Sequence, residues 1–196
     1  MIVMYLRTFI IKILFFILSN LLSLSRLEVD TQQLIFPTNN YTINKVIKQA
    51  NKSLLTKKFK TICIAGCHGK TTTTAMTSHV LNKIKGINYL IGDGTGYANP
   101  QNEYFALESC EYKRHFLSYQ PYYTVILNID LDHVDYFKDI NDVINAYEEF
   151  ANSSTKMIVA NGDDVNVRKM NITKDISYFG LKDNNDIIAK NIEYTK

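Results

Sequence analysis

The 196-residue sequence has few cysteines, and most of its length has no excess of basic residues. Three cysteines are too few, and odd in number, for a scaffold held together by disulfides. Residues 61–196 carry thirteen Lys or Arg against seventeen Asp or Glu, so they lack the clustered basic face of a nucleic-acid-binding protein. With 46% hydrophobic and 21% charged residues, the composition is that of a globular protein and excludes a disordered or collagen-like chain.

The sequence also lacks an uninterrupted apolar run long enough to cross a membrane. Residues 1–26 are largely apolar, but Arg7 and Lys12 leave only the thirteen residues from 13 to 25 free of charge. A spanning helix needs about 20 such residues. Three interpretations of this segment remain open: contact with a membrane through residues 1–25, a buried helix, or an aberrant start of the reading frame.

The remaining sequence divides into a polar part and an α/β part. We expect residues 27–59, which are polar and basic, to form a linker with one helix. Beyond them, short apolar runs alternate with helical patterns, which is typical of parallel βαβ units. Helices are expected at about 70–84 and at 139–153, the second capped by Asp139 or Asn141. The expected strands are 61–65, 89–91, 104–108, 123–128 and 156–161.

The predicted fold class is therefore α/β, with a mostly parallel sheet covered by helices on both faces and preceded by an apolar N-terminal helix. We assign it to residues 60–196 as one domain. In sheets of this kind, functional sites gather at the carboxyl ends of the strands, so the segments that follow each strand are the ones to examine.

The strongest local pattern is AGCHGKTTTT, residues 65–74, between an expected strand and an expected helix. Backbone N–H groups of a glycine-rich turn at a helix N-terminus hold phosphate. Ile64 stands where the longer Walker pattern has glycine, so this is the shorter GxxGKT form, in which Lys70 would neutralise phosphate charge and Thr71 would ligate Mg²⁺. The alternative is a chance GKT in a strand–helix turn. The residues predicted to bind a nucleotide here are Gly66, Cys67, His68, Gly69, Lys70, Thr71 and Thr72.

Acidic residues follow the next expected strand. In YFALESCEY, Glu108 stands at the carboxyl end of that strand, where a carboxylate could bind the cation between a nucleotide and a second substrate. Glu111, three residues further on, is expected to be a partner behind it. Taken alone, Glu108 would more simply be an exposed acid at a strand end.

A third segment, NIDLDHVDYF (128–137), again comes directly after an apolar strand. It clusters Asp130, Asp132, His133 and Asp135 within six residues. A neutral imidazole at His133 could ligate a second cation, with an aspartate orienting the ring. The alternative is a histidine with a purely structural role.

Together the three segments resemble the central ATP-binding domain of the Mur ligases. Within that family, IGDGTG (91–96), ESCEYKRHFLSYQP (108–121) and NIDLDHVDYFKDINDV (128–143) are most similar to the UDP-N-acetylmuramate:L-alanine ligases. The resemblance covers roughly residues 33–196, and the motifs fall in the family's order and spacing.

The resemblance implies an ATP-dependent carboxylate–amine ligase of peptidoglycan synthesis in the cytoplasm, with ATP and Mg²⁺ as cofactors and UDP-N-acetylmuramate and L-alanine as substrates. It implies that Lys70 binds the ATP phosphates and that Thr71 and Glu108 bind Mg²⁺. His133 would serve the second metal, and Asn128 would help to position the site. Lys70, Glu108 and His133 are accordingly the predicted catalytic residues. In the family reaction an acyl phosphate forms from the carboxylate and ATP, and the amine then displaces phosphate.

The sequence also departs from the family pattern. The glycine-rich turn of the family's UDP-binding domain does not occur before Gly66, and the C-terminal part of the family is absent after Lys196. We therefore expect a fragment that keeps the ATP/Mg²⁺ domain, incomplete at its C-terminal end, its missing domains supplied by a separate chain. The alternatives are an inactive or split-gene remnant, membrane-tethered through its apolar start, and, more weakly, a ligase like folylpolyglutamate synthase. The three cysteines are expected to be reduced thiols. The alternative for Cys67, at a helix N-terminus, is a thiol with a lowered pKa that oxidises readily.

Overall fold

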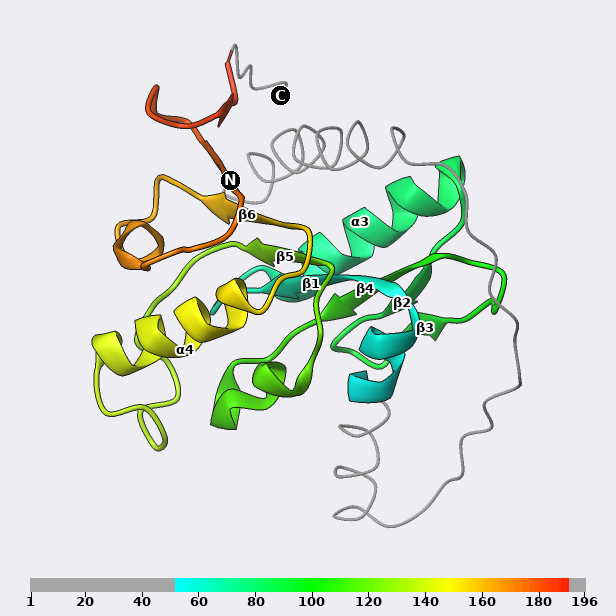
Figure 1. Ribbon diagram of the computed structural model, residues 1–196, viewed down its shortest axis with the longest axis horizontal. Helices are drawn as coiled ribbons and strands as arrows, with labels where there is room; N and C mark the ends of the chain where they lie inside the picture. Colours follow the sequence, from blue (N-terminus) through cyan, green and yellow to red (C-terminus); the bar gives the residue numbers. More distant parts are fainter. Residues whose placement is uncertain (1–51, 191–196) are drawn as a thin grey trace, which may run out of the picture.

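A computed structural model describes residues 52–190 and places an eight-stranded sheet at their centre (Figure 1). The strand order is β3-β2-β4-β1-β5-β6-β7-β8, and every neighbouring pair is parallel except β2 with β3. The strands are β1 (Lys60–Ala65), β2 (Asn88–Leu90), β3 (Gly96–Tyr97), β4 (Tyr104–Glu108), β5 (Tyr123–Ile126), β6 (Met157–Asn161), β7 (Ile176–Gly180) and β8 (Ile187–Ile188). The predicted mostly parallel sheet is thus confirmed, whereas the apolar segment at residues 1–26 lies outside the described residues.

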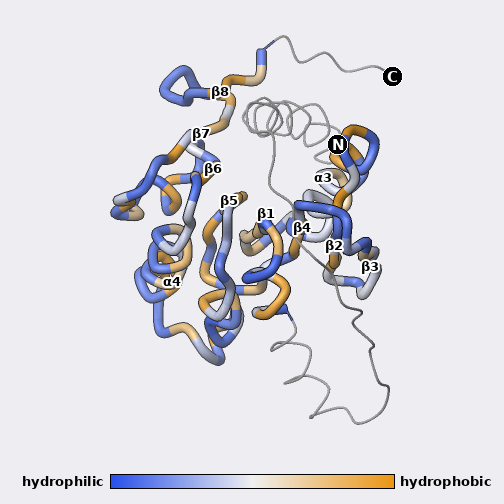
Figure 2. Tube along the Cα trace, turned by 45° about the vertical axis from the view of Figure 1, so that its right-hand side comes forward, coloured by the Kyte–Doolittle hydropathy of each residue, from blue (hydrophilic) through white to orange (hydrophobic). Residues whose placement is uncertain are grey.

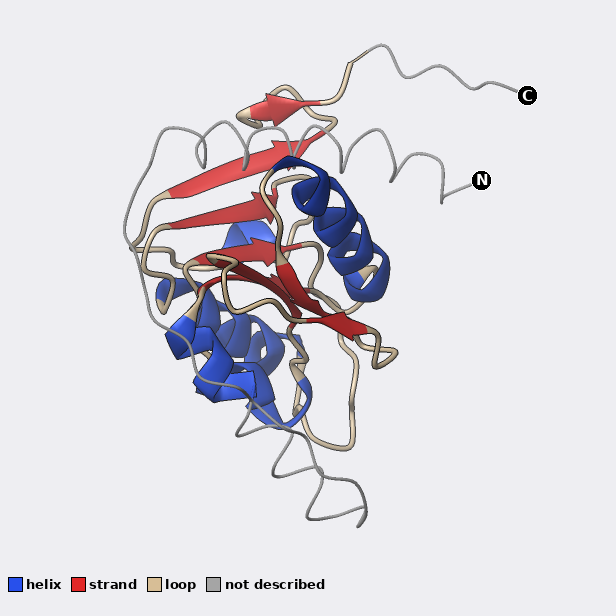
Figure 3. Cartoon of the chain, turned by 90° about the vertical axis from the view of Figure 1, so that its right-hand side faces the viewer, coloured by secondary structure: helices blue, strands red, loops and turns tan. Residues whose placement is uncertain are grey.

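Helices cover both faces of the sheet, as predicted. Helix α3 (Lys70–Ile84) lies on one face, and α4 (Ile140–Asn152) lies on the other together with the 3-10 segment η1 (Tyr112–Ser118) (Figure 3). A second short 3-10 turn, η2 (Val167–Lys169), follows β6. Covering both faces is what allows β1, β4 and β5 to be apolar along nearly their whole length.

The side chains of β1 alternate between the two halves of the core. Ile62 and Ile64 belong to a cluster with Leu81 of α3, while Cys63 and Ala65 belong to the cluster on the α4 side. This alternation follows from the two-residue period of a strand. Figure 2, coloured by hydropathy, shows hydrophobic residues concentrated on the central strands and hydrophilic ones mostly in the surrounding loops.

Helix α4 begins where its sequence predicts. The Asp139 side chain accepts a hydrogen bond from Asp142 N at 2.9 Å, so Asp139 is the N-cap, one of the two residues proposed for that role. On the buried side, Phe150 stacks on Phe116 of η1 with ring centroids 4.4 Å apart, and Tyr147 meets the same ring edge-on at 5.3 Å. The helix therefore fixes η1 as well as covering the sheet.

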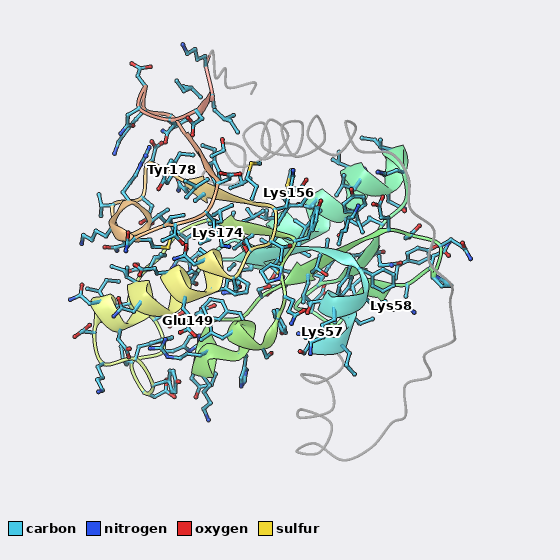
Figure 4. The ribbon with its side chains drawn as sticks, in the orientation of Figure 1. Lys57, Lys58, Glu149, Lys156, Lys174 and Tyr178 are labelled. Carbon is cyan, nitrogen blue, oxygen red and sulfur yellow. The ribbon has the colours of Figure 1, made fainter. Side chains whose placement is uncertain are left out.

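The last two strands, β7 and β8, were not predicted. The loop that joins them is held in place by hydrogen bonds. The Asp163 carboxylate accepts hydrogen bonds from the backbone N–H groups of Leu181 and Lys182 and from Asn185 Nδ2. The guanidinium of Arg168 donates to Gly162 O and Asn185 Oδ1 and lies 3.8 Å from the ring centroid of Tyr178, which Figure 4 labels. Because polar contacts hold this part of the chain in place, its sequence lacks the apolar pattern by which a buried strand is recognised.

The chain enters the sheet through a helical turn at 52–58. Lys57 and Lys58 are exposed at the end of this turn (Figure 4), and Lys60, the first residue of β1, pairs with Glu103. Between residues 52 and 190 no helix has the length and apolar character that a membrane crossing requires.

Candidate functional site

The loop between β1 and α3 is shaped by two glycines. Gly66 has φ 151°, and Gly69, the N-cap of α3, has φ 82°, both in the region that favours glycine. A Cβ at Gly66 would stand 2.9 Å from Leu127 Cβ, so the loop passes directly against the chain that follows β5. No side chain caps α3, which leaves its first N–H groups available to an anion.

The segment after β5 holds this loop by its backbone. The side chain of Asn128 accepts a hydrogen bond from His68 N at 2.8 Å and donates one to His68 O at 2.9 Å. Next to it, the Cys67 thiol donates to Asp130 O and accepts from Asp130 N, at 3.2 and 3.1 Å. The predicted loop residues and Asn128 are therefore in contact, and Asn128 positions the peptide of the loop.

Lys70, the first residue of α3, reaches back over the loop. Its Nζ donates to Gly66 O at 2.5 Å and Cys67 O at 3.2 Å, and it forms an ion pair with Glu111 Oε2 at 3.1 Å. The side chain of Lys70 is 14% exposed and that of Glu111 only 1%. The predicted phosphate-binding lysine thus faces a buried carboxylate that follows β4.

The same carboxylate faces the predicted histidine. His133 Nε2 lies 3.6 Å from Glu111 Oε1 and 3.9 Å from Asp132 Oδ2. The backbone of His133 is left-handed, with φ 54°. Its ring packs on Tyr112 with centroids 4.5 Å apart, and the Tyr112 hydroxyl donates to Asp135 Oδ2 at 2.7 Å. The loops after β4 and β5 are thereby joined around His133.

One group of side chains in this part of the chain could hold a metal ion. Glu111, Asp132 and His133 each offer one ligand atom, and these atoms lie within 4.8 Å of one another. Two carboxylates fit a hard cation such as Mg²⁺, which commonly takes one or two carboxylates and completes its shell with water and phosphate oxygens. Mg²⁺ binds imidazole less readily than softer metals do. The His133 ring could equally accept a hydrogen bond from a water molecule bound to the cation.

Glu108 ends β4 beside the phosphate loop, since it lies in register with Ile64 of β1. Its carboxylate accepts a hydrogen bond from Gly92 N at 2.7 Å. Within residues 52–190 that carboxylate forms no hydrogen bond or ion pair with Lys70 or His133. The metal-binding role assigned to Glu108 therefore stays a prediction.

Thr71 and Thr72, predicted to bind nucleotide, are exposed in the first turn of α3, and His68 is exposed in the loop. His79 is exposed further along α3. The carboxyl edge of the sheet thus presents a backbone anion site, a lysine, hydroxyl groups and a carboxylate–imidazole pair.

The structure contradicts the alternative of a reactive thiol at Cys67 and leaves all three cysteines as free thiols. Burial raises the pKa of the Cys67 thiol, and the nearby Glu111 carboxylate adds to that effect. Burial likewise raises the pKa of Cys110, and it raises that of Cys63 to about 12. The dipole of α3 fails to lower the Cys67 pKa because the side chain turns into the protein, toward Asp130 and Tyr147.

The residue whose importance the sequence understated is Glu111, which was expected only behind Glu108. It is buried because the chain after Glu108 turns sharply: Lys113 and Arg114 both adopt left-handed backbone conformations, with φ 52° and 55°. Arg114 N donates to Glu111 O at 2.8 Å within this turn. The only signal available in the sequence was a second acid three residues after the first.

Fold and loop together define the class of protein: a mostly parallel α/β domain of the P-loop type, with a GxxGKT loop between its central strand and a helix. The family described as the Mur ligase middle domain matches residues 64–196, well over half of the sequence. The chain belongs to the Mur ligase family.

Solved structures show the same fold at low sequence identity. A MurF ligase from Thermotoga maritima in complex with ADP is 20% identical, with a TM-score of 0.61 over 87% of this chain and 43% of its own. UDP-N-acetylmuramate:L-alanyl-gamma-D-glutamyl-meso-diaminopimelate ligase from Neisseria meningitides is 21% identical, with a TM-score of 0.57 over 70% of this chain and 53% of its own. MurF from Acinetobacter baumannii is 20% identical, with a TM-score of 0.58 over 74% and 36%. The chain thus spans about a third to a half of the length of these enzymes.

Proposed function

We propose that this chain binds ATP with Mg²⁺ as the nucleotide-binding domain of an ATP-dependent Mur ligase of peptidoglycan precursor synthesis. Its motifs further favour UDP-N-acetylmuramate as the carboxylate substrate and L-alanine as the amine. The observation that carries the proposal is that Glu111 contacts Lys70 of the phosphate loop on one side and His133 on the other. Three segments far apart in the sequence thereby place groups that handle phosphate and cations at one edge of the sheet.

The phosphate loop supports the nucleotide part of the proposal. The uncapped N-terminus of α3 offers N–H groups to the terminal phosphates, and Lys70 adds a positive charge within reach of them. Asn128 keeps the His68 peptide in place, so the loop is ordered before a ligand arrives. A preorganised site of this kind stabilises developing phosphate charge without rearranging.

The chemistry proposed for this chain is that of the Mur ligase family. A carboxylate oxygen of the acceptor attacks the γ-phosphorus of ATP and forms an acyl phosphate, and ADP leaves. The substrate amine then attacks the acyl carbon, inorganic phosphate leaves, and the amine gives up a proton. Mg²⁺ would supply charge neutralisation on the phosphates, next to Glu111, Asp132 and His133. Lys70 would bind the transferred phosphoryl group, on which most negative charge develops during the reaction.

Isothermal titration of the full chain with ATP and Mg²⁺ tests the proposal. We expect Lys70→Ala to weaken binding at least about tenfold, because a charge-assisted contact to phosphate is lost. Lys83→Ala, an equal charge change at the far end of α3, should bind like the unmodified protein. Equal binding by Lys70→Ala and the unmodified chain would contradict the proposal.

The ligase assignment needs a separate test, because nucleotide binding is shared with other ligases. Phosphate release from ATP would be measured with UDP-N-acetylmuramate and each candidate amine. Ligation requires substrates to be held in line with the γ-phosphate, so we expect turnover to rise when the parts of a Mur ligase beyond this domain are added as a separate chain. Release that depends on a folate substrate would favour a folylpolyglutamate synthase-like ligase. ATP binding without turnover under any of these conditions would favour an inactive remnant.

A further inference from the structure

Glu111 is an unusual acid for its position. Among residues 52–190 it is the only charged side chain in the fully buried set, at 1% exposure. A carboxylate out of reach of water is strongly disfavoured unless cations or hydrogen-bond donors surround it. Here the neighbours are the ammonium of Lys70 at 3.1 Å and the imidazole of His133 at 3.6 Å.

The backbone on both sides of this contact is strained, which indicates that the arrangement is enforced. Lys113 and Arg114, just after Glu111, and His133, opposite it, are the three non-glycine residues with positive φ among the described residues. Such conformations are unfavourable for residues other than glycine and persist only where the surroundings determine them. The Arg114 guanidinium is tied to Asp142 at 2.6 Å, which anchors the first turn to α4.

Lys70 has no donor to spare while it holds this position. An ammonium group has three N–H donors, and Nζ has three partners: Gly66 O, Cys67 O and the Glu111 carboxylate. A phosphate that takes Lys70 must therefore displace one of them. If it displaces Glu111, a buried carboxylate is left facing the negative charge of the phosphate.

A cation resolves this conflict. Glu111 Oε1 already lies on the side of His133 and Asp132, within the group of ligand atoms that a metal ion could bridge. A divalent cation there would replace the charge of Lys70 as the partner of the carboxylate and would also attract the incoming phosphates.

We infer that Glu111 is a positioning residue that makes nucleotide binding depend on a divalent cation. With no cation its carboxylate keeps Lys70 turned onto the loop and repels the triphosphate; with a cation it exchanges Lys70 for the metal, and Lys70 becomes available to phosphate. The inference rests on the proposed function, because it concerns ATP at the same loop. Besides contact with the metal, it assigns to Glu111 the control of Lys70, a role that was not predicted for Glu108.

The test compares ATP affinity in Mg²⁺ with ATP affinity in EDTA, by isothermal titration of the full chain. Each protein yields a ratio of the two dissociation constants. We expect Glu111→Gln to bind metal-free ATP more tightly, by roughly tenfold, because one negative charge near the phosphates is removed. The gain from Mg²⁺ should shrink by at least about the same factor. Glu103→Gln is the matched control: it removes one acid just before β4, at the opposite edge of the sheet, and its ratio should equal that of the unmodified chain.

The outcomes separate the inference from the function on which it rests. An unchanged ratio in Glu111→Gln overturns the inference, and so does a weakening by the same factor with and without Mg²⁺, which is the result of a structural role. If no variant binds ATP at all, the proposed function fails and the inference fails with it. Should Glu111→Gln not fold, Lys70→Ala is compared with Lys70→Ala/Glu111→Gln, in which no buried charge is left unpaired. The gain in ATP affinity from Mg²⁺ must then be smaller in the double variant than in the single one, by at least about the same factor.

Discussion

Asn128 forms two hydrogen bonds with the peptide of His68, accepting from its N–H at 2.8 Å and donating to the carbonyl at 2.9 Å. The amide thereby links the segment after β5 to the phosphate loop, although 60 residues separate the two in the sequence. The phosphate loop is therefore held in place by a segment outside it.

Replacing Asn128 with Ala should loosen the phosphate loop. Two hydrogen bonds of about 1 kcal/mol each are lost, so we expect unfolding to become easier by about 1 to 2 kcal/mol. ATP affinity should fall by about tenfold, since the loop must then be ordered on binding. Thermal unfolding and titration calorimetry measure the two effects. Asn145→Ala, on the exposed side of α4, is the control and should change neither. Full ATP affinity in Asn128→Ala would show that the link to His68 does not order the loop.

Gly66 should not tolerate a side chain. Alanine at this position would place a Cβ 2.9 Å from Leu127 Cβ and 3.3 Å from Asn128 N, in a backbone conformation that disfavours it as well. We expect a loss of about 2 to 4 kcal/mol in the free energy of unfolding, from urea denaturation.

Comparison with Gly94→Ala separates the packing contribution at Gly66 from the contribution of the backbone conformation. Gly94 also has a positive φ, of 93°, but no atom lies within 4 Å of the position that an alanine methyl group would take there. Its loss should be limited to about 1 to 2 kcal/mol from the backbone alone. Equal losses at the two glycines would mean that the contact between the loop and Leu127 is not tight.

Asp163 should make stability depend on pH. Partial burial raises the pKa of its carboxyl, but the hydrogen bonds from Leu181 N, Asn185 Nδ2 and Lys182 N outweigh burial and lower the pKa below its usual value. The pKa of Asp163 in the folded state is thus below its pKa in the unfolded state, which is about 3.9. The stabilisation is therefore complete above the unfolded pKa and is lost as the pH falls through the folded pKa.

We accordingly expect Asp163→Asn to be less stable than the unmodified chain by about 1 to 2 kcal/mol at neutral pH. The difference in the free energy of unfolding between the two proteins should narrow as the pH drops below about 4, because the Asp163 carboxyl of the unmodified chain then becomes protonated and loses its charge. Urea denaturation across this range measures it, and Asp175→Asn, an exposed acid just before β7, is the control. A difference that stays constant down to the most acidic pH would rule out the charge of Asp163 as its source.

Most of the sheet could be predicted from the sequence because its strands are buried on both faces. The run at 104–108 matches β4 in full, and the run at 61–65 differs from β1 by one residue. β5 ends at Ile126, two residues before the predicted end, because Leu127 and Asn128 turn toward the phosphate loop. β7 was not predicted because Ser177 and Tyr178 interrupt its apolar residues, which leaves too weak a pattern to identify a buried strand.

The site was predictable in part. The GxxGKT loop and His133 have recognisable sequence contexts, since each lies in the segment that follows an apolar strand. The contacts of Glu111 were beyond prediction, because they depend on a turn in which two ordinary residues, Lys113 and Arg114, take left-handed conformations. Sequence patterns locate strand ends, but they do not tell which of two nearby acids turns inward.

The central claim is that Lys70, Glu111 and His133 serve one nucleotide and its cation. Mn²⁺ added with ATP tests it most directly, because the paramagnetic ion broadens the NMR signals of nearby histidine rings. The account predicts that the His133 signal broadens first, well before that of His79, which lies about 13 Å further along α3 from Lys70. A His133 signal that stays sharp while Mn²⁺ and ATP saturate the protein would contradict the account.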